Sequence, residues 1–150
     1  MITAKADVLV FEEIDRVYQF VAPDFVTNYP RWSPEVVSLE PLSVGPVQVG
    51  FQARQTRVDH GHKSESVFEV AELEPLKRVC FKGVSDPFRS IYEFDDRSSS
   101  TLLTFTFEVE ALAPHIRPFE KLVRIAVQDG ARRLVKKLKL LIEKEMLNNV

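Results

Sequence analysis

Hydroxyl groups lie among aromatic residues on two stretches of this sequence, and they are the first candidates for chemistry. In the run Phe88 to Phe94, Ser90 and Tyr92 share a face with the two phenylalanines if the chain is extended, and Ser66 shares a face with Phe68 in the same way. A hydroxyl that is buried without a hydrogen-bond partner costs roughly 1 to 3 kcal/mol. We therefore expect these hydroxyls to satisfy one another, to reach solvent, or to bind a ligand.

An arginine is the second candidate for a polar group in such a site. The stretch Phe51 to Val58 has a comparable mixture of residues on both faces, so alternation leaves open whether Arg54 or Arg57 points inward. The inward arginine would be placed to meet a carboxylate or an enolate.

Metal, nucleophile and cofactor sites have little support. His60 and His62 lie in a predicted hairpin turn, and no Cys or acidic pair completes a known ligand spacing, so no metal site is predicted. The five glycines are scattered and form neither a dinucleotide nor a phosphate-binding loop, so no cofactor is expected. Cys80 shares a strand face with Arg78 and Lys82, which indicates an outer face near positive charge; an inert thiol is the preferred interpretation. No residue can be assigned a catalytic role.

Composition indicates one globular domain, residues 1–150, with 45% hydrophobic residues and a net charge of −2. From His115 onward the charge is +5, from nine basic and four acidic residues, whereas the preceding part is −7. This balance gives no reason to expect nucleic acid. The single cysteine and the absence of a signal peptide pattern favour the cytoplasm, and no apolar run is long enough for stable membrane insertion.

The elements that must position these groups follow from periodicity. Period-two runs separated by turn signals predict an opening strand and a six-stranded meander of hairpins. The strands are expected at Ala6 to Phe11, Val36 to Ser43, Phe51 to Val58, Lys63 to Leu73, Arg78 to Val84, Phe88 to Phe94 and Thr101 to Val109. Helical spacing predicts a short helix over Glu13 to Ala22. The segment Asp24 to Pro34, which holds Trp32, is expected to be a turn-rich loop.

A long amphipathic helix is predicted from about Pro118 to Met146, with an apolar stripe that includes Val127 and Gly130. The stripe needs an apolar partner, so the sheet is expected to curve around it. A mid-helix glycine costs roughly 1 kcal/mol relative to alanine, which suggests that Gly130 makes room for a ligand or lets the sheet approach closely. The basic residues on this helix predict a solvated face, with transient membrane contact as the alternative; they are Arg132, Arg133, Lys136, Lys137 and Lys144.

This order of elements resembles the α+β helix-grip fold of the Bet v 1 and START-like proteins. Local sequences are similar to the polyketide cyclase/dehydrase family within that superfamily; they are Tyr29 to Pro34, Val49-Gly50, Phe68 to Val70, Glu74 to Val79, Tyr92 to Phe94 and Ser100 to Thr104. The resemblance implies a seven-stranded sheet around the C-terminal helix and a cavity between them for lipids, polyketides or other apolar molecules. It supplies no universal catalytic motif.

The preferred hypothesis is a binding module for a small hydrophobic ligand. Its cavity should exceed roughly 300 Å³ and be lined by Phe68, Tyr92, Phe105, Phe107 and the Val123 to Leu134 face of the helix. Trp32 is expected either to lean over the mouth of this cavity or to have a plain packing role. A cyclase or dehydratase using the same cavity is the first alternative, although no acidic residue can be placed inside it. A protein interaction module is the second.

Overall fold

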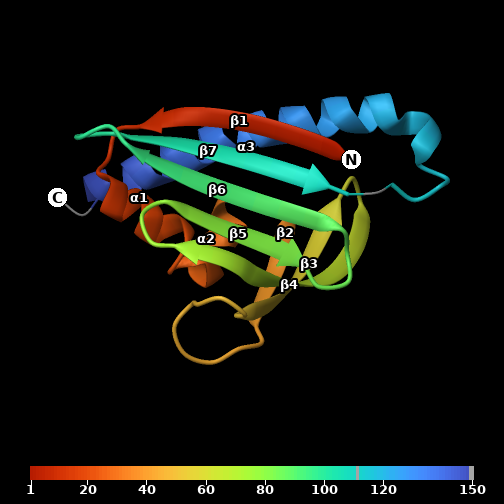
Figure 1. Ribbon diagram of the computed structural model, residues 1–150, viewed down its shortest axis with the longest axis horizontal. Coiled ribbons are helices and arrows are strands. Elements are labelled where there is room, and N and C mark those ends of the chain that lie inside the picture. The colour runs from red at the N-terminus through yellow and green to blue at the C-terminus, as the bar shows by residue number, and fades with distance from the viewer. Residues whose placement is uncertain (111, 149–150) are drawn as a thin grey trace.

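The protein consists of a seven-stranded antiparallel sheet and three α-helices in the computed structural model, which describes residues 1–110 and 112–148 (Figure 1). The strands are β1 (Ile2–Val10), β2 (Val36–Pro41), β3 (Gln52–Asp59), β4 (His62–Glu74), β5 (Arg78–Gly83), β6 (Phe88–Asp96) and β7 (Thr101–Val109). The helices are α1 (Ile14–Val21), α2 (Phe25–Trp32) and α3 (Glu120–Asn148), and a 3-10 turn, η1 (Arg117–Phe119), precedes α3. The predicted seven strands, the short helix after the first strand and the long C-terminal helix are confirmed in their order.

The sheet is a meander to which the first strand is added at the far end. Its strand order is β1-β7-β6-β5-β4-β3-β2, so consecutive strands are neighbours from β2 to β7 and β1 pairs with β7. The register places Tyr92 opposite Phe105 and Phe81 opposite Ser90. Because side chains alternate between faces, these four residues lie on the same face of the sheet, the one that carries the core.

The segment between α1 and β2 differs from the expected loop. Residues Phe25 to Trp32 form α2 although Pro30 lies inside it. The missing N–H of Pro30 falls in the last turn of a short helix, and the buried side chains of Phe25, Asn28 and Trp32 on one face stabilise the turn. The turn-forming residues of this segment predicted a loop, but packing of its buried side chains stabilises a helix instead. The opening strand also begins earlier than expected, at Ile2 instead of Ala6.

Helix α3 packs on the molecule through its C-terminal half. Ala131, Val135, Leu138 and Ile142 are at most 3% exposed. By contrast, Leu122 is 65% exposed, so the N-terminal part of the predicted stripe does not cover the sheet as expected.

Helix α3 runs beside the free edge of β1 (Figure 1), and this edge explains why the N-terminal part of α3 does not cover the sheet. An edge strand presents backbone groups that need hydrogen-bond partners, and side chains of α3 supply them every few residues. The bonds are Arg124 Nη2 to Met1 O (3.1 Å), Lys5 N to Gln128 Oε1 (3.2 Å), Gln128 Nε2 to Lys5 O (2.9 Å), Lys139 Nζ to Leu9 O (2.8 Å) and Phe11 N to Glu143 Oε2 (2.9 Å). We call this series the edge seam. Among the described residues, no helix has the length and apolarity needed to cross a membrane.

Candidate functional site

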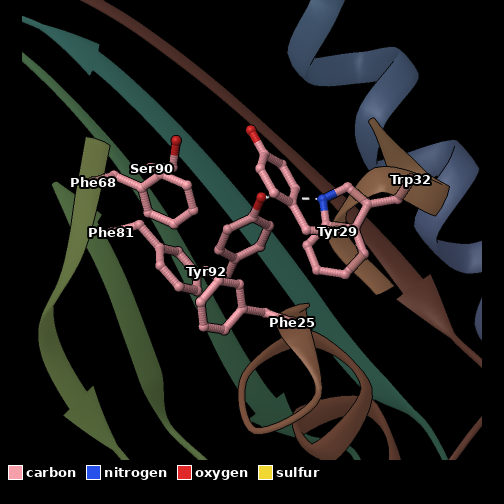
Figure 2. Close-up of a pocket in the computed structure, with 7 residues that line it drawn as sticks. All are labelled: Phe25, Tyr29, Trp32, Phe68, Phe81, Ser90 and Tyr92. Atoms are coloured by element: carbon pink, nitrogen blue, oxygen red, sulfur yellow. Dashed lines mark hydrogen bonds between the residues drawn. The ribbon is translucent and has the colours of Figure 1, made fainter. Parts of the chain in front are cut away.

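Aromatic side chains from α2 and from the inner face of the sheet meet in a pocket beneath α2 (Figure 2). Helix α2 contributes Phe25, Tyr29 and Trp32; the sheet contributes Phe68 from β4, Phe81 from β5 and Ser90 and Tyr92 from β6. We call these seven residues the aromatic pocket. Sequence alternation thus correctly placed Phe68, Ser90 and Tyr92 on the inner face.

The rings of the aromatic pocket pack closely against one another. Ring centroids lie 4.9 Å apart for Phe25 and Phe81, 5.8 Å for Phe68 and Phe81, and 5.9 Å for Trp32 and Tyr92. The void among these rings is about 20 Å³, which is room for about one water molecule. The expected ligand-sized cavity is therefore not open at the aromatic pocket. The physical reason is α2, because a helix in place of a loop carries three aromatic side chains into that space.

Trp32 has the packing role, which is one of the two roles expected for it. Its side chain is 2% exposed, so it does not lean over a pocket mouth, and its Nε1 donates a hydrogen bond of 3.2 Å to the Tyr92 hydroxyl. Burial raises the pKa of Tyr92 well above its ordinary value of 10.0. The phenol is therefore neutral at physiological pH and its oxygen acts as an acceptor for the indole.

A polar group adjoins the aromatic pocket at Tyr29. The Tyr29 hydroxyl donates to Gln55 Oε1 (3.0 Å) and accepts from Arg57 Nη1 (3.2 Å), while Gln55 Nε2 donates to Ser66 Oγ (3.2 Å). Two further bonds of 3.2 Å hold the Arg57 guanidinium on the Asp59 carboxylate. Burial raises the pKa of the Tyr29 phenol, and the Arg57 charge acts in the opposite direction. We call Tyr29, Gln55, Arg57 and Ser66 the polar end.

The two arginines of β3 are now distinguished. Arg57 shares the inner face with Gln55 and joins the polar end. Arg54 lies on the other face, where it is paired with Glu40 (3.4 Å) and Glu65 (3.2 Å). The inclusion of Arg54 in the site was therefore wrong, because two residues three positions apart on a strand point to opposite faces.

The remaining predicted site residues extend away from the aromatic pocket. The Phe105 ring is buried with its centroid 4.9 Å from that of Tyr92. Phe107 is half-buried and stacks with Phe88 at 6.2 Å, and Val127 is half-buried against the core. A Cβ on Gly130 would meet Arg133 Nη2 at 3.8 Å as its nearest neighbour. A close approach of the sheet is thus not the reason for this glycine, and the space beside it is open.

Several residues of the site were missed from the sequence. Phe25 and Tyr29 are four residues apart and Trp32 follows after three, a helical spacing that could have indicated α2 and its inward face. Phe81 lies two residues after Val79 in β5, so alternation could have placed both side chains on the same buried face. Gln55 gave no signal until the inward face of β3 was known.

The other candidate groups have structural roles. Across residues 1–110 and 112–148, no cluster of His, Cys, Asp and Glu could hold a metal ion. His60 and His62 are exposed at the β3–β4 turn, as predicted. Cys80 is on the outer face but fully buried, and burial raises the pKa of its thiol, which agrees with an inert residue.

The sheet, the long C-terminal helix and the two short helices between β1 and β2 define a helix-grip protein of the START and Bet v 1 type. A family model described as polyketide cyclase / dehydrase and lipid transport matches residues 1–143, and the chain belongs to this family. No curated protein matches the chain.

Solved structures share the fold at low sequence identity. A protein from Thermus thermophilus is 20% identical, with a TM-score of 0.75 over 95% of this chain and 98% of that one. A START superfamily protein from Mycobacterium smegmatis is 19% identical, with a TM-score of 0.75 over 96% and 99%. The ZhuI aromatase/cyclase from Streptomyces sp. R1128 is 14% identical, with a TM-score of 0.74 over 96% and 94%. At these identities the likeness shows the fold alone.

Proposed function

We propose that the protein binds a small, largely apolar molecule that carries an acidic oxygen, between the inner face of the sheet and helices α2 and α3. The observation that carries the proposal is the polar end beside the aromatic pocket, where Arg57 and Tyr29 adjoin a set of apolar rings. Small-molecule sites combine such apolar walls with a few convergent polar groups. Family membership supports binding of this general kind.

The ligand must displace side chains to enter, because the void holds about one water molecule. Helix α2 is the element to move, since it supplies three of the seven lining residues. A ligand there would contact Trp32, Phe68, Ser90 and Tyr92. It would extend along the inner face past Phe105 and Phe107 toward Val127 and Gly130, where the helix leaves space.

The polar end sets the chemistry of the ligand. The Arg57 guanidinium is about one quarter exposed at its side chain, at 28%, and is held in orientation by Asp59. A guanidinium forms its strongest hydrogen bonds with carboxylate-like oxygens. Tyr29 is a neutral phenol and would supply a second hydrogen bond to the same oxygen. A carboxylate or an enolate is therefore the expected polar group of the ligand.

A cyclase or dehydratase activity is the second candidate. It is favoured by the pairing of a neutral phenol, whose pKa is raised by burial, with a cation that would stabilise an enolate. The family description and the aromatase/cyclase among the structural neighbours are consistent with it. No carboxylate lines the aromatic pocket, so proton transfer would fall to Tyr29 or Tyr92.

The test compares decanoate with decanol, which share a ten-carbon chain and differ in the head group, a carboxylate in one and a hydroxyl in the other. Isothermal calorimetry should show saturable binding of decanoate, and Arg57→Met should weaken it about tenfold or more while leaving decanol unchanged. Arg54→Met is the matched control, since it removes the same charge from the outer face of the same strand. Absence of saturable binding of both ligands, or equal losses in both variants, would contradict the proposal.

Catalysis is tested separately by product analysis. If the protein only binds ligands, a polyketide-like β-ketone substrate should be recovered unchanged after incubation with it. A cyclised or dehydrated product that disappears in Tyr29→Phe and Arg57→Met, with affinity retained, would instead establish the enzyme.

Cytoplasmic location and a single domain over residues 1–150 remain predictions.

A further inference from the structure

The solvent side of α3 carries aliphatic and basic side chains together. The helix packs on the molecule through Ala131, Val135, Leu138 and Ile142. Successive residues turn by about 100° around a helix axis, so the line opposite this buried face can be identified. It passes through Leu122, Ile125, Asp129, Arg133, Lys136 and Leu140. Leu122 and Leu140 are each 65% exposed and Ile125 is 53% exposed.

Basic residues dominate the charge of this face. Four are exposed on or beside the line, between Leu122 and Leu140: Arg132, Arg133, Lys136 and Lys137. The acidic residue on the line is Asp129, whose carboxylate is 3.5 Å from Arg132. The chain before His115 has a net charge of −7, so the positive charge is concentrated on this helix.

We propose that this face of α3 docks on an anionic lipid membrane, with the helix lying in the plane of the surface. The distance from Leu122 to Leu140 is about 27 Å at 1.5 Å per residue, and the cations lie between the aliphatic ends. On a bilayer, the aliphatic side chains enter between lipid headgroups while the cations contact lipid phosphates. An acidic protein would need apolar pockets at matching positions along a convex rod, whereas a lipid surface adapts to it.

The proposal goes beyond ligand binding and does not depend on it. Val127 is on the same helix but on the side that packs against the core. A docked α3 would bring that side close to the membrane, where apolar molecules are stored.

Vesicle sedimentation with the full chain tests the proposal. The probes are phosphatidylcholine vesicles with and without about 30% phosphatidylserine, at about 0.1 M and about 0.5 M salt. The protein should bind the anionic vesicles about tenfold or more tightly than the neutral ones, and the difference should shrink at high salt. Arg133→Glu/Lys136→Glu and Leu122→Ser/Leu140→Ser should each weaken binding about tenfold or more.

Matched variants elsewhere on the surface serve as controls. Lys63→Glu/Lys77→Glu makes the same charge change, and Val44→Ser/Val49→Ser removes aliphatic side chains that are 94% and 60% exposed. Both should bind like the unmodified protein, and circular dichroism should show every variant folded.

Three outcomes overturn the proposal. The first is absence of binding to anionic vesicles. The second is full binding by either α3 variant. The third is a dimer in ultracentrifugation that Leu122→Ser/Leu140→Ser dissociates, with no vesicle binding, because the face would then join two copies of the chain.

Discussion

Gly130 is a residue whose environment allows two opposite changes to be predicted. A Cβ there meets nothing closer than 3.8 Å, so Gly130→Ala should stabilise the protein by about 0.5 to 1 kcal/mol through helix propensity. Gly130→Leu should also fold but fill the space beside the helix, lowering decanoate affinity about tenfold or more. Urea unfolding and calorimetry measure the two effects.

Gly130→Ala is itself the control for the larger side chain. It should retain decanoate affinity, because a methyl group leaves most of the space open. Unchanged affinity in a folded Gly130→Leu protein would reject a role for this position in binding.

Residue positions were predictable from sequence where alternation was clean. Ser90 and Tyr92 were placed correctly because every second residue of their strand is aromatic or hydroxylic. The sequence could not show whether Arg54 or Arg57 points inward, because both faces of β3 carry polar side chains. Their direction is seen only from their partners in the fold, which are Glu40 and Glu65 for Arg54 and Tyr29 for Arg57. The sequence left open whether Trp32 packs inside or leans over a pocket mouth, because its hydrogen bond to Tyr92 joins positions 60 residues apart and no local pattern records it.

Helix α2 is the element whose motion should control access to the aromatic pocket. Arg31 ties it to the end of α3 through Glu145 (3.1 Å) and also bonds Asn28 (3.0 Å). The pair is more than a third exposed, so Arg31→Ala should lower the free energy of unfolding by less than about 1 kcal/mol. It should nevertheless speed amide exchange in α2 and speed ligand association, measured by hydrogen exchange and by stopped-flow Trp32 fluorescence.

A comparable pair remote from α2 provides the control. Arg97→Ala breaks the exposed ion pair with Asp95 near the β6–β7 turn. It should change neither the exchange of α2 nor the association rate. If Arg31→Ala also leaves both unchanged, ligand entry does not proceed through α2.

Elements were predictable to the extent that their periodicity was regular. Strands β2 to β7 were found because period-two runs alternate with turn residues. Helix α3 was found too, but its rotation about its own axis was not, since the apolar stripe from Phe119 to Gly130 predicts a buried face. The edge seam competes with that stripe, because unpaired backbone groups of β1 need donors and acceptors such as Gln128. Hydrophobic periodicity contains no information about that requirement.

Stability of the whole molecule should fall in alkaline solution. Burial raises the pKa values of Tyr18, Tyr29 and Tyr92 above 10.0 in the folded protein. Below pH 10 the phenols are neutral in both states and contribute no pH dependence. Above it, the unfolded chain loses protons that the folded protein retains, so the free energy of unfolding decreases by up to about 1.4 kcal/mol per pH unit for each phenol.

Urea midpoints at pH values on both sides of 10 measure this effect. Tyr92→Phe should lower stability at neutral pH, because Trp32 Nε1 loses its acceptor, but should make the alkaline decline shallower. Absorbance of tyrosinate should rise together with unfolding and not before it. An equally steep decline in Tyr92→Phe would show that the phenol of Tyr92 does not contribute to it.

The place of β1 also has a consequence for how the chain is made. A ribosome releases this strand well before its partners β7 and α3. Until then Ile2–Val10 has no native neighbour in the sheet, and both of its edges are open to pairing with other chains. Completion of this fold therefore waits until α3 has been made, and β1 needs protection from other chains until then.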